Sequence, residues 1–204
     1  MTFDFRLDDL GDAPDDATDD MACDVRAWVW YGYYATEAMD RWIQEAADEG
    51  RGVDIGWIKA LLARTLARKR AAEATWPAVT DTDRLDNAFE KLNAQGICAL
   101  QWAGNTLDDG FEAVDEALEA DHAPAGGYQG YCFFHSQDID RALDGEGLLL
   151  AFGHIDSKRA QDHLRIGEIV RQALQQEGIE VAWDGKGDTR INLPRLRWHR
   201  RTPD

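Results

Sequence analysis

The residues best suited to chemistry are His135 and Asp138, which stand three positions apart directly after an apolar run. An imidazole beside a carboxylate is a plausible general base, because the carboxylate fixes the tautomer of the ring and raises its basicity. Asp109 and Asp184 each follow another apolar segment and could add acid–base or metal-binding capacity. The sequence therefore raises the hypothesis of a hydrolase-like site with His135, Asp138, Asp109 and Asp184 as its catalytic residues.

The same residues also suit a purely structural role, which is the interpretation that we favour. Thr106 and Ser136 are typical helix N-caps, and an aspartate in the first turn of a helix interacts favourably with the helix dipole. On this interpretation Asp109 and Asp138 stabilise helix starts, and His135 ends a strand with its ring hydrogen-bonded to the backbone.

The elements that would position these residues alternate between helix and strand from residue 80 onward. Thr80 and Asp83 have the spacing of a capping box, and Thr106 is expected to cap a helix whose Phe111 faces inward. Short apolar runs predict five strands, over residues 97–102, 128–134, 147–152, 179–183 and 190–193. The alternation predicts an α/β fold with a largely parallel sheet of four strands, and Pro194 marks the fifth as an antiparallel edge strand.

A largely parallel sheet would bring the four candidate residues together. The carboxyl ends of parallel strands lie at one rim of the sheet, where ligands bind in open α/β folds. The shortest connection, from His135 to Glu146, has 12 residues, which is close to the minimum for a parallel crossover. The hypothesis of a shared site depends on this strand direction.

The first part of the chain divides into an acidic tail and a helical arm. We expect residues 1–22 to be a disordered acidic tail, residues 23–76 a helical arm, and residues 77–204 the α/β domain. In the arm, one helix is predicted from Val25 into the forties, and a second follows Asp54 as its N-cap. The arm holds tryptophans that either pack within the chain or join two copies of it.

Charge and composition argue against several classes of binding partner. The chain of 204 residues has 39 acidic and 22 basic residues, and the net charge of −17 argues against binding to nucleic acid. Its apolar runs are too short to span a membrane, no secretory signal is visible, and the three cysteines lack a C-x-x-C spacing. We therefore expect a cytoplasmic protein without membrane contact. No phosphate-binding or zinc-protease motif is present, so no cofactor and no metal are predicted.

Three functions are compatible with these observations. The first, which we favour, is a non-enzymatic binding protein whose acidic surface engages a basic protein partner, as an inhibitor or immunity-type factor does. The second is the small hydrolase-like enzyme described above. The third is a structural homodimer joined through the aromatic helical arm.

Several sequence blocks also resemble a known family. They include Ala103-Gly104-Asn105-Thr106, the run from Gly130 to Asp138, and Trp183-Asp184-Gly185. On these blocks, residues from about 76 to 201 resemble a bacterial protein family of unknown function. The resemblance implies that the α/β region is one unit, and it implies no reaction.

Overall fold

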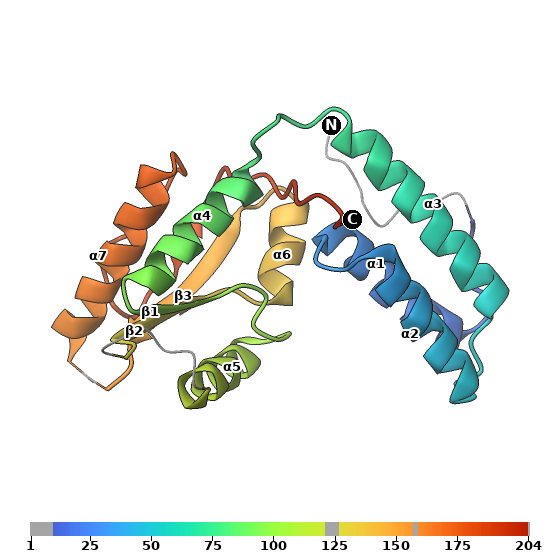
Figure 1. The fold of residues 1–204 in the computed structure, drawn as a ribbon, viewed down its shortest axis with the longest axis horizontal. Helices are drawn as coiled ribbons and strands as arrows, with labels where there is room; N and C mark the ends of the chain where they lie inside the picture. The colour runs from blue at the N-terminus through green and yellow to red at the C-terminus, as the bar shows by residue number, and fades with distance from the viewer. Residues whose placement is uncertain (1–9, 121–126, 157–158, 204) are drawn as a thin grey trace. The chain divides into compact units, whose positions relative to one another are not determined.

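The chain forms two compact units in a computed structural model that describes residues 10–120, 127–156 and 159–203. The first unit comprises Met1–Ala78 together with His199–Asp204, and the second comprises Val79–Trp198 (Figure 1). The chain therefore leaves the first unit after residue 78 and returns to it after residue 198. The last part of the predicted C-terminal domain thus packs with the helical arm.

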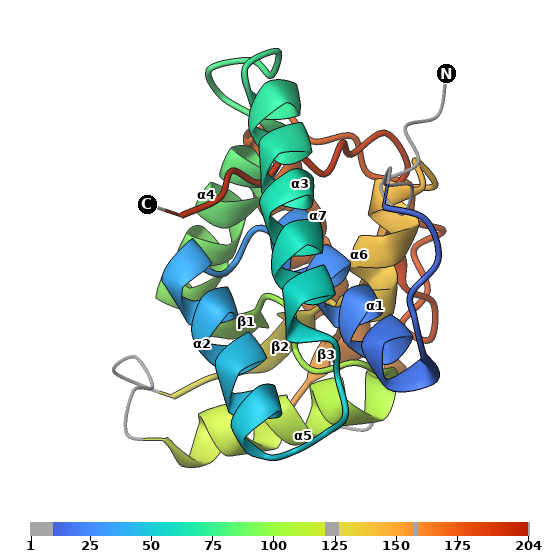
Figure 2. The same ribbon diagram turned by 90° about the vertical axis from the view of Figure 1, so that its right-hand side faces the viewer.

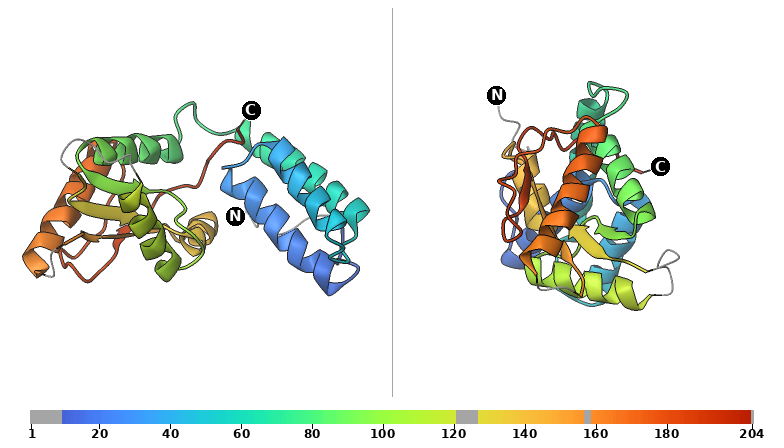
Figure 3. Two further views of the ribbon diagram at one scale, coloured as in Figure 1. Left: turned by 60° about the horizontal axis from the view of Figure 1, so that its bottom comes forward. Right: turned by 90° about the vertical axis from the view of Figure 1, so that its left-hand side faces the viewer.

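The described residues of the first unit form the helices α1 (Asp16–Tyr31), α2 (Thr36–Asp48) and α3 (Ile55–Glu73), which can be followed in Figure 2 and in the left panel of Figure 3. Asp54 caps α3 as expected, because its carboxylate accepts a hydrogen bond of 2.9 Å from the backbone N–H of Trp57. Apolar side chains at helical spacing form the core between the helices, among them Val25, Met39, Ile43 and Ile58.

Two expectations for this unit need correction. Helix α1 begins at Asp16, so residues 16–22 are helical and not part of a disordered tail; residues 1–9 lie outside the described residues. The reason is that Met21 and Ala22 are buried against the helical core, which offsets the cost of ordering this acidic stretch. The single helix predicted from Val25 is two helices, because Gly32 adopts a left-handed conformation (φ 75°) and ends α1.

Residues 199–203 complete the first unit. The ring of His199 stacks on Trp76 at 4.6 Å between centroids, and the guanidinium of Arg200 lies over Tyr33 at 4.4 Å. The backbone N–H of Thr202 donates to the carboxylate of Glu73 at 2.8 Å. This segment therefore holds its place through aromatic and polar contacts with α3 and its surroundings.

The second unit alternates helices and strands in chain order. Its elements are α4 (Asp81–Ala94), β1 (Ile97–Leu100), α5 (Leu107–Glu119), β2 (Gly130–Phe133), α6 (Ser136–Leu143), β3 (Leu148–His154), α7 (Ala160–Gln176) and β4 (Ile191–Leu193). The capping box of Thr80 and Asp83 starts α4, and Thr106 with Asp109 forms a second capping box at the start of α5. The predicted strand over residues 179–183 is absent from the described residues, where Ala182 forms only an isolated bridge to Asn192.

The sheet is mixed and mostly antiparallel, so the prediction of a largely parallel sheet was wrong. The strand order is β1-β2-β3-β4; β1 and β2 are parallel, whereas β3 is antiparallel to both of its neighbours. The connection through α6 begins and ends at the same end of the sheet, where Gly145 and Gly147 (φ 81° and 82°) turn the chain into β3. As predicted, β4 is an antiparallel edge strand.

Helices cover both faces of the sheet. Helices α4 and α7 pack together, as the right panel of Figure 3 shows; Ile166 of α7 contacts Gly130 of β2, on one face. On the other face α5 packs over Phe133, and α6 packs against β3. Since side chains alternate between the faces of a strand, Gly130 and Phe133 point to opposite layers.

Gly110 allows α5 to lie directly on the sheet. A Cβ atom at this position would stand 2.1 Å from the ring of Phe133, which is fully buried. Gly110→Ala is therefore expected to lower the free energy of unfolding by about 1–3 kcal/mol, although alanine is the better helix former. Urea unfolding followed by circular dichroism measures the change.

The matched control is Gly56→Ala in α3, because Gly56 is an exposed helical glycine of the other unit. This variant is expected to change the free energy of unfolding by less than about 1 kcal/mol. Equal stability of Gly110→Ala and the wild type would contradict the close packing of α5 on Phe133.

No helix within the described ranges is long and apolar enough to cross a membrane.

Candidate functional site

The parallel pair of strands brings two of the predicted loops together. Beyond β1 and β2, the N–H of Ala103 donates to the carbonyl of Phe134 at 2.8 Å, and the N–H of Ser136 donates to that of Gly104 at 3.0 Å. Trp102, two residues after the end of β1, adopts a φ of 48°, a left-handed conformation that residues other than glycine rarely take. The starts of α5 and α6 therefore lie side by side.

The centre of this region is an ionic cluster of His135 and Asp138, which are buried, and Arg190, which is partly exposed. The side chain of Asp138 accepts from Arg190, and His135 Nε2 lies 3.3 Å from Asp138 Oδ2. The same carboxylate accepts from the backbone N–H of His135 at 3.1 Å, and Arg190 also donates to the carbonyl of Leu149 at 2.9 Å. The cluster ties the start of α6 to β3 and to the residue before β4.

Burial dominates the electrostatics of His135. His135 is 4% exposed to solvent, and Asp138 is 2% exposed. Burial lowers the pKa of the His135 ring below its usual value, and the charge of Arg190 acts in the same direction, against the attraction of Asp138. His135 Nδ1 is buried and has no hydrogen-bond partner among the described residues. Burial therefore favours the neutral form of the ring, and Nδ1 is its nitrogen without a hydrogen-bond partner among the described residues.

Asp109 lies near this cluster but is used in a capping box. Its carboxylate accepts from the backbone N–H groups of Asn105 and Thr106, at 2.8 and 2.9 Å. These hydrogen bonds hold the pKa of Asp109 below its usual range, and the carboxylate in turn favours the charged form of His135. Asp109 therefore acts on His135 through its charge, while its hydrogen bonds stabilise the start of α5.

Asp184 is not brought to the same place. Its carboxylate accepts from the hydroxyl of Thr189 at 2.5 Å and from the N–H of Lys186 at 3.1 Å, and these bonds lower its pKa. The turn that carries it packs on α7, where Gly187 approaches His163. His163 also accepts from the N–H of His154, the last residue of β3. Because β3 is antiparallel to β2, this end of the sheet lies opposite His135.

Arg190 is the member of the cluster that we did not predict as a site residue. The sequence places it next to a strand, but it stands 52 positions from Asp138. Only the order of the strands reveals that the two are neighbours. A weak signal was present, since a basic residue adjoins the short apolar strand Ile191–Leu193.

Helix α5 presents an acidic surface that nothing in the described chain neutralises. Its exposed carboxylates are those of Asp108, Glu112, Asp115, Glu116 and Glu119. None of them forms an ion pair within residues 10–120, 127–156 and 159–203, whereas Glu168, Glu177 and Glu180 are paired with arginine or lysine. Phe111, predicted to face inward, is 39% exposed, as is Leu107.

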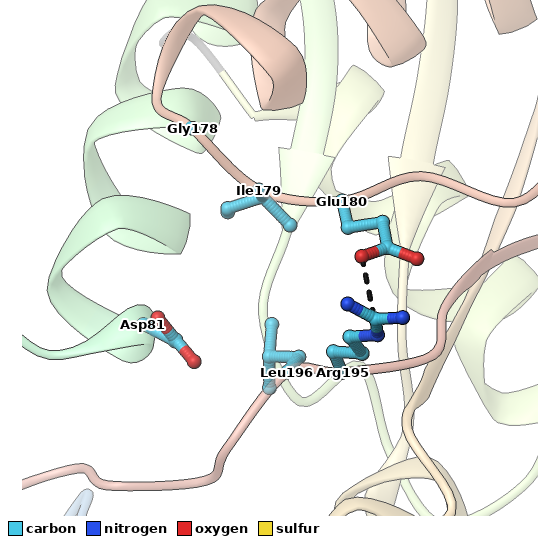
Figure 4. Close-up of a pocket in the computed structure, with 6 residues that line it drawn as sticks. All are labelled: Asp81, Gly178, Ile179, Glu180, Arg195 and Leu196. Atoms are coloured by element: carbon cyan, nitrogen blue, oxygen red, sulfur yellow. Dashed lines mark ion pairs between the residues drawn. The ribbon is translucent and has the colours of Figure 1, made fainter.

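A pocket of about 190 Å³ lies elsewhere in the second unit (Figure 4). It is lined by Asp81, Gly178, Ile179, Glu180, Arg195 and Leu196, none of which is a predicted site residue. Its charged groups already have partners: Arg195 Nε lies 3.3 Å from a Glu180 carboxylate oxygen, and Asp81 accepts from the N–H of Arg197.

The cysteines provide no reactive thiol in the sheet. Cys98 and Cys132 are buried, and burial raises the pKa of both, that of Cys98 to about 11. Within the part of the chain that the structure describes, no three His, Cys, Asp or Glu side chains are grouped so that they could hold a metal ion.

Comparison with protein families extends the resemblance to both units. The sequence profile of the domain of unknown function DUF6891 matches residues 14–202, from the residue before the N-cap of α1 to the segment that packs beside Glu73. The chain belongs to this family. The DUF6891 match includes the helical arm and so extends beyond residues 76–201, to which the resemblance was assigned from the sequence. Comparison with the curated proteins and with the solved structures finds no match.

Proposed function

We propose that this protein is a non-catalytic binding protein whose acidic surface engages a basic protein partner. The observation that carries the proposal is the set of exposed carboxylates on α5 that form no ion pair with described residues. Unpaired charges of one sign steer a partner of the opposite sign and favour it over other proteins. Inhibitors and immunity-type factors of basic proteins are roles of this kind.

The hydrolase-like alternative has less support. His135 and Asp138 are almost completely buried, and the carboxylate is already engaged by Arg190. Asp184 lies at the other end of the sheet, beside α7. A general base must come within hydrogen-bond reach of the proton that it removes, and a buried, paired cluster gives a substrate no route to that position.

The homodimer alternative also has less support. The aromatic side chains of the arm pack within their own unit: Trp42 meets Trp28 and Tyr34 edge to face at 5.0 and 4.5 Å. The large apolar residues that are exposed in the described chain, Val79, Leu107 and Phe111, all lie in the other unit.

Capture from a lysate of the producing cells tests the proposal. The full chain is immobilised, and bound proteins are compared at about 0.05 M and about 0.5 M salt, where the range of electrostatic forces falls from roughly 14 to 4 Å. We expect a basic protein that binds at low salt and is released at high salt, and the purified pair should show the same salt dependence of Kd. Capture that is insensitive to salt, or the absence of any basic protein, would contradict the proposal.

A further inference from the structure

Helix α5 combines two features that a binding surface needs. Its exposed carboxylates recur at helical spacing from Asp108 to Glu119, so they occupy one face. Leu107 and Phe111 are one turn apart along the border of that face, and both are 39% exposed. The ring of Phe111 is supported edge to face by Phe133 and Tyr131, at 5.3 and 5.8 Å. The apolar pair is therefore presented on a rigid base.

The charges of α5 oppose the stability of the helix itself. Asp108, Glu112 and Glu116 follow one another at intervals of four, as do Asp115 and Glu119, and like charges at this spacing repel. The last turns of the helix carry carboxylates and no basic residue, although the helix dipole favours cations there. A sequence that departs from local stability rules without compensation within the fold indicates a functional requirement.

We propose that α5 is the docking surface for a basic amphipathic helix of another protein. The proposal rests on the proposed function and names the surface and the form of the partner. Lysine or arginine side chains on the bound helix lie along the carboxylates from Asp108 to Glu119, and an apolar side chain packs between Leu107 and Phe111. Two helices in contact align side chains three and four positions apart, which matches the spacing of both the acidic row and the apolar pair.

A synthetic peptide tests the surface directly. The probe is an amphipathic helical peptide with lysines on one face and leucines on the other, and its scrambled isomer has the same charge without the faces. Fluorescence anisotropy with the full chain is expected to show tighter binding of the amphipathic peptide. Neutralising the five exposed carboxylates of α5 (D108N, E112Q, D115N, E116Q, E119Q) is expected to weaken binding at least tenfold. The same variant should melt at a higher temperature, because the repulsion within α5 is removed.

Two further variants distinguish the contribution of apolar contact to peptide binding from that of charge. Leu107→Gln alone, and Leu107→Ser with Phe111→Ser, should remove the preference for the amphipathic peptide over its scrambled isomer. The single variant keeps the test valid if the double variant unfolds. The matched control neutralises five exposed acidic residues of α2 and its C-terminus, Glu37, Asp40, Glu45, Asp48 and Glu49, and should bind as the wild type does.

The outcomes distinguish the two proposals. If the α2 control weakens binding as much as the α5 variant, binding depends on total charge; the docking surface is then wrong while the proposed function stands. If the wild type binds neither peptide at about 0.05 M salt, both proposals fail, because electrostatic attraction is strongest there. Unchanged preference in the Leu107 variants overturns the apolar part of the surface.

Discussion

Asp138→Ala is expected to lower the free energy of unfolding by about 3 kcal/mol, the lower end of the usual cost of removing one partner from a buried ion pair, because the side chain of Arg190 is 27% exposed. The carboxylate is the shared acceptor of the cluster, since it interacts with Arg190, with the ring of His135 and with the backbone N–H of His135. Without it the partly exposed guanidinium loses its buried counter-ion, and the N-terminus of α6 loses its acceptor. Urea unfolding measures the change.

The matched control for this variant is Asp109→Ala. Asp109 occupies the equivalent capping-box position of α5, but its side chain is partly exposed. Loss of a helix cap costs only about 1 kcal/mol. In the double variant Asp138→Ala with Arg190→Met, the loss should be smaller than the sum of the single losses, because neither charge is left unpaired. Equal losses for Asp138→Ala and Asp109→Ala would contradict the buried cluster.

The stability of the helical unit is expected to rise with pH in a way that depends on Lys69. This side chain is 0% exposed, and its Nζ donates to the carbonyl of Val29 at 2.7 Å. Burial lowers the pKa of Lys69 to about 8 from its usual 10.5; Glu73 opposes this shift, and Arg200 adds to it. Lys69 therefore satisfies a carbonyl at the C-terminal end of α1 at the cost of a buried charge.

The direction of the pH dependence follows from the number of protons that the folded and unfolded states bind. Between the pKa of about 8 in the folded chain and 10.5 in the unfolded chain, the unfolded state binds the proton that the folded state has lost. Stability therefore increases as pH rises through this range and is lost again as pH falls through 8, by up to about 3 kcal/mol in total. Urea unfolding of the wild type and of Lys69→Met, between pH 7 and 10, gives the difference that isolates this group.

Lys59→Met is the matched control, because Lys59 is exposed on the same helix. Its difference from the wild type is expected to stay constant over the same pH range. A constant difference for Lys69→Met as well would show that the ammonium group is not buried in the folded protein.

Local features of this fold could be predicted from the sequence. The caps at Asp54, Thr80 and Thr106 were correctly placed, because a capping interaction depends on residues only three positions apart. The same holds for His135 and Asp138, whose spacing brings them together on any helix that starts at Ser136. Each of these interactions needs only one helix end to form.

Features that depend on strand direction could not be predicted in the same way. The run Leu148–His154 is apolar in either direction, and a connection near the lower limit of length fits both a parallel and an antiparallel neighbour. The antiparallel β3 separates Asp184 from His135 and brings Arg190 to Asp138. The inward orientation expected for Phe111 holds only in part, since its ring contacts Phe133 but is 39% exposed, and Gly110 and Val114 supply the buried stripe of α5.

The chain passes from the helical unit to the α/β unit and back again, which has a consequence for the synthesis of the protein. The helical unit is closed by residues 199–203, which the ribosome adds only after all of residues 79–198. The α/β unit is thus an insertion within a helical host, whose closure awaits the stacking of His199 on Trp76. The helical unit can therefore be completed only after the whole inserted unit has been synthesised, although α1, α2 and α3 are made first.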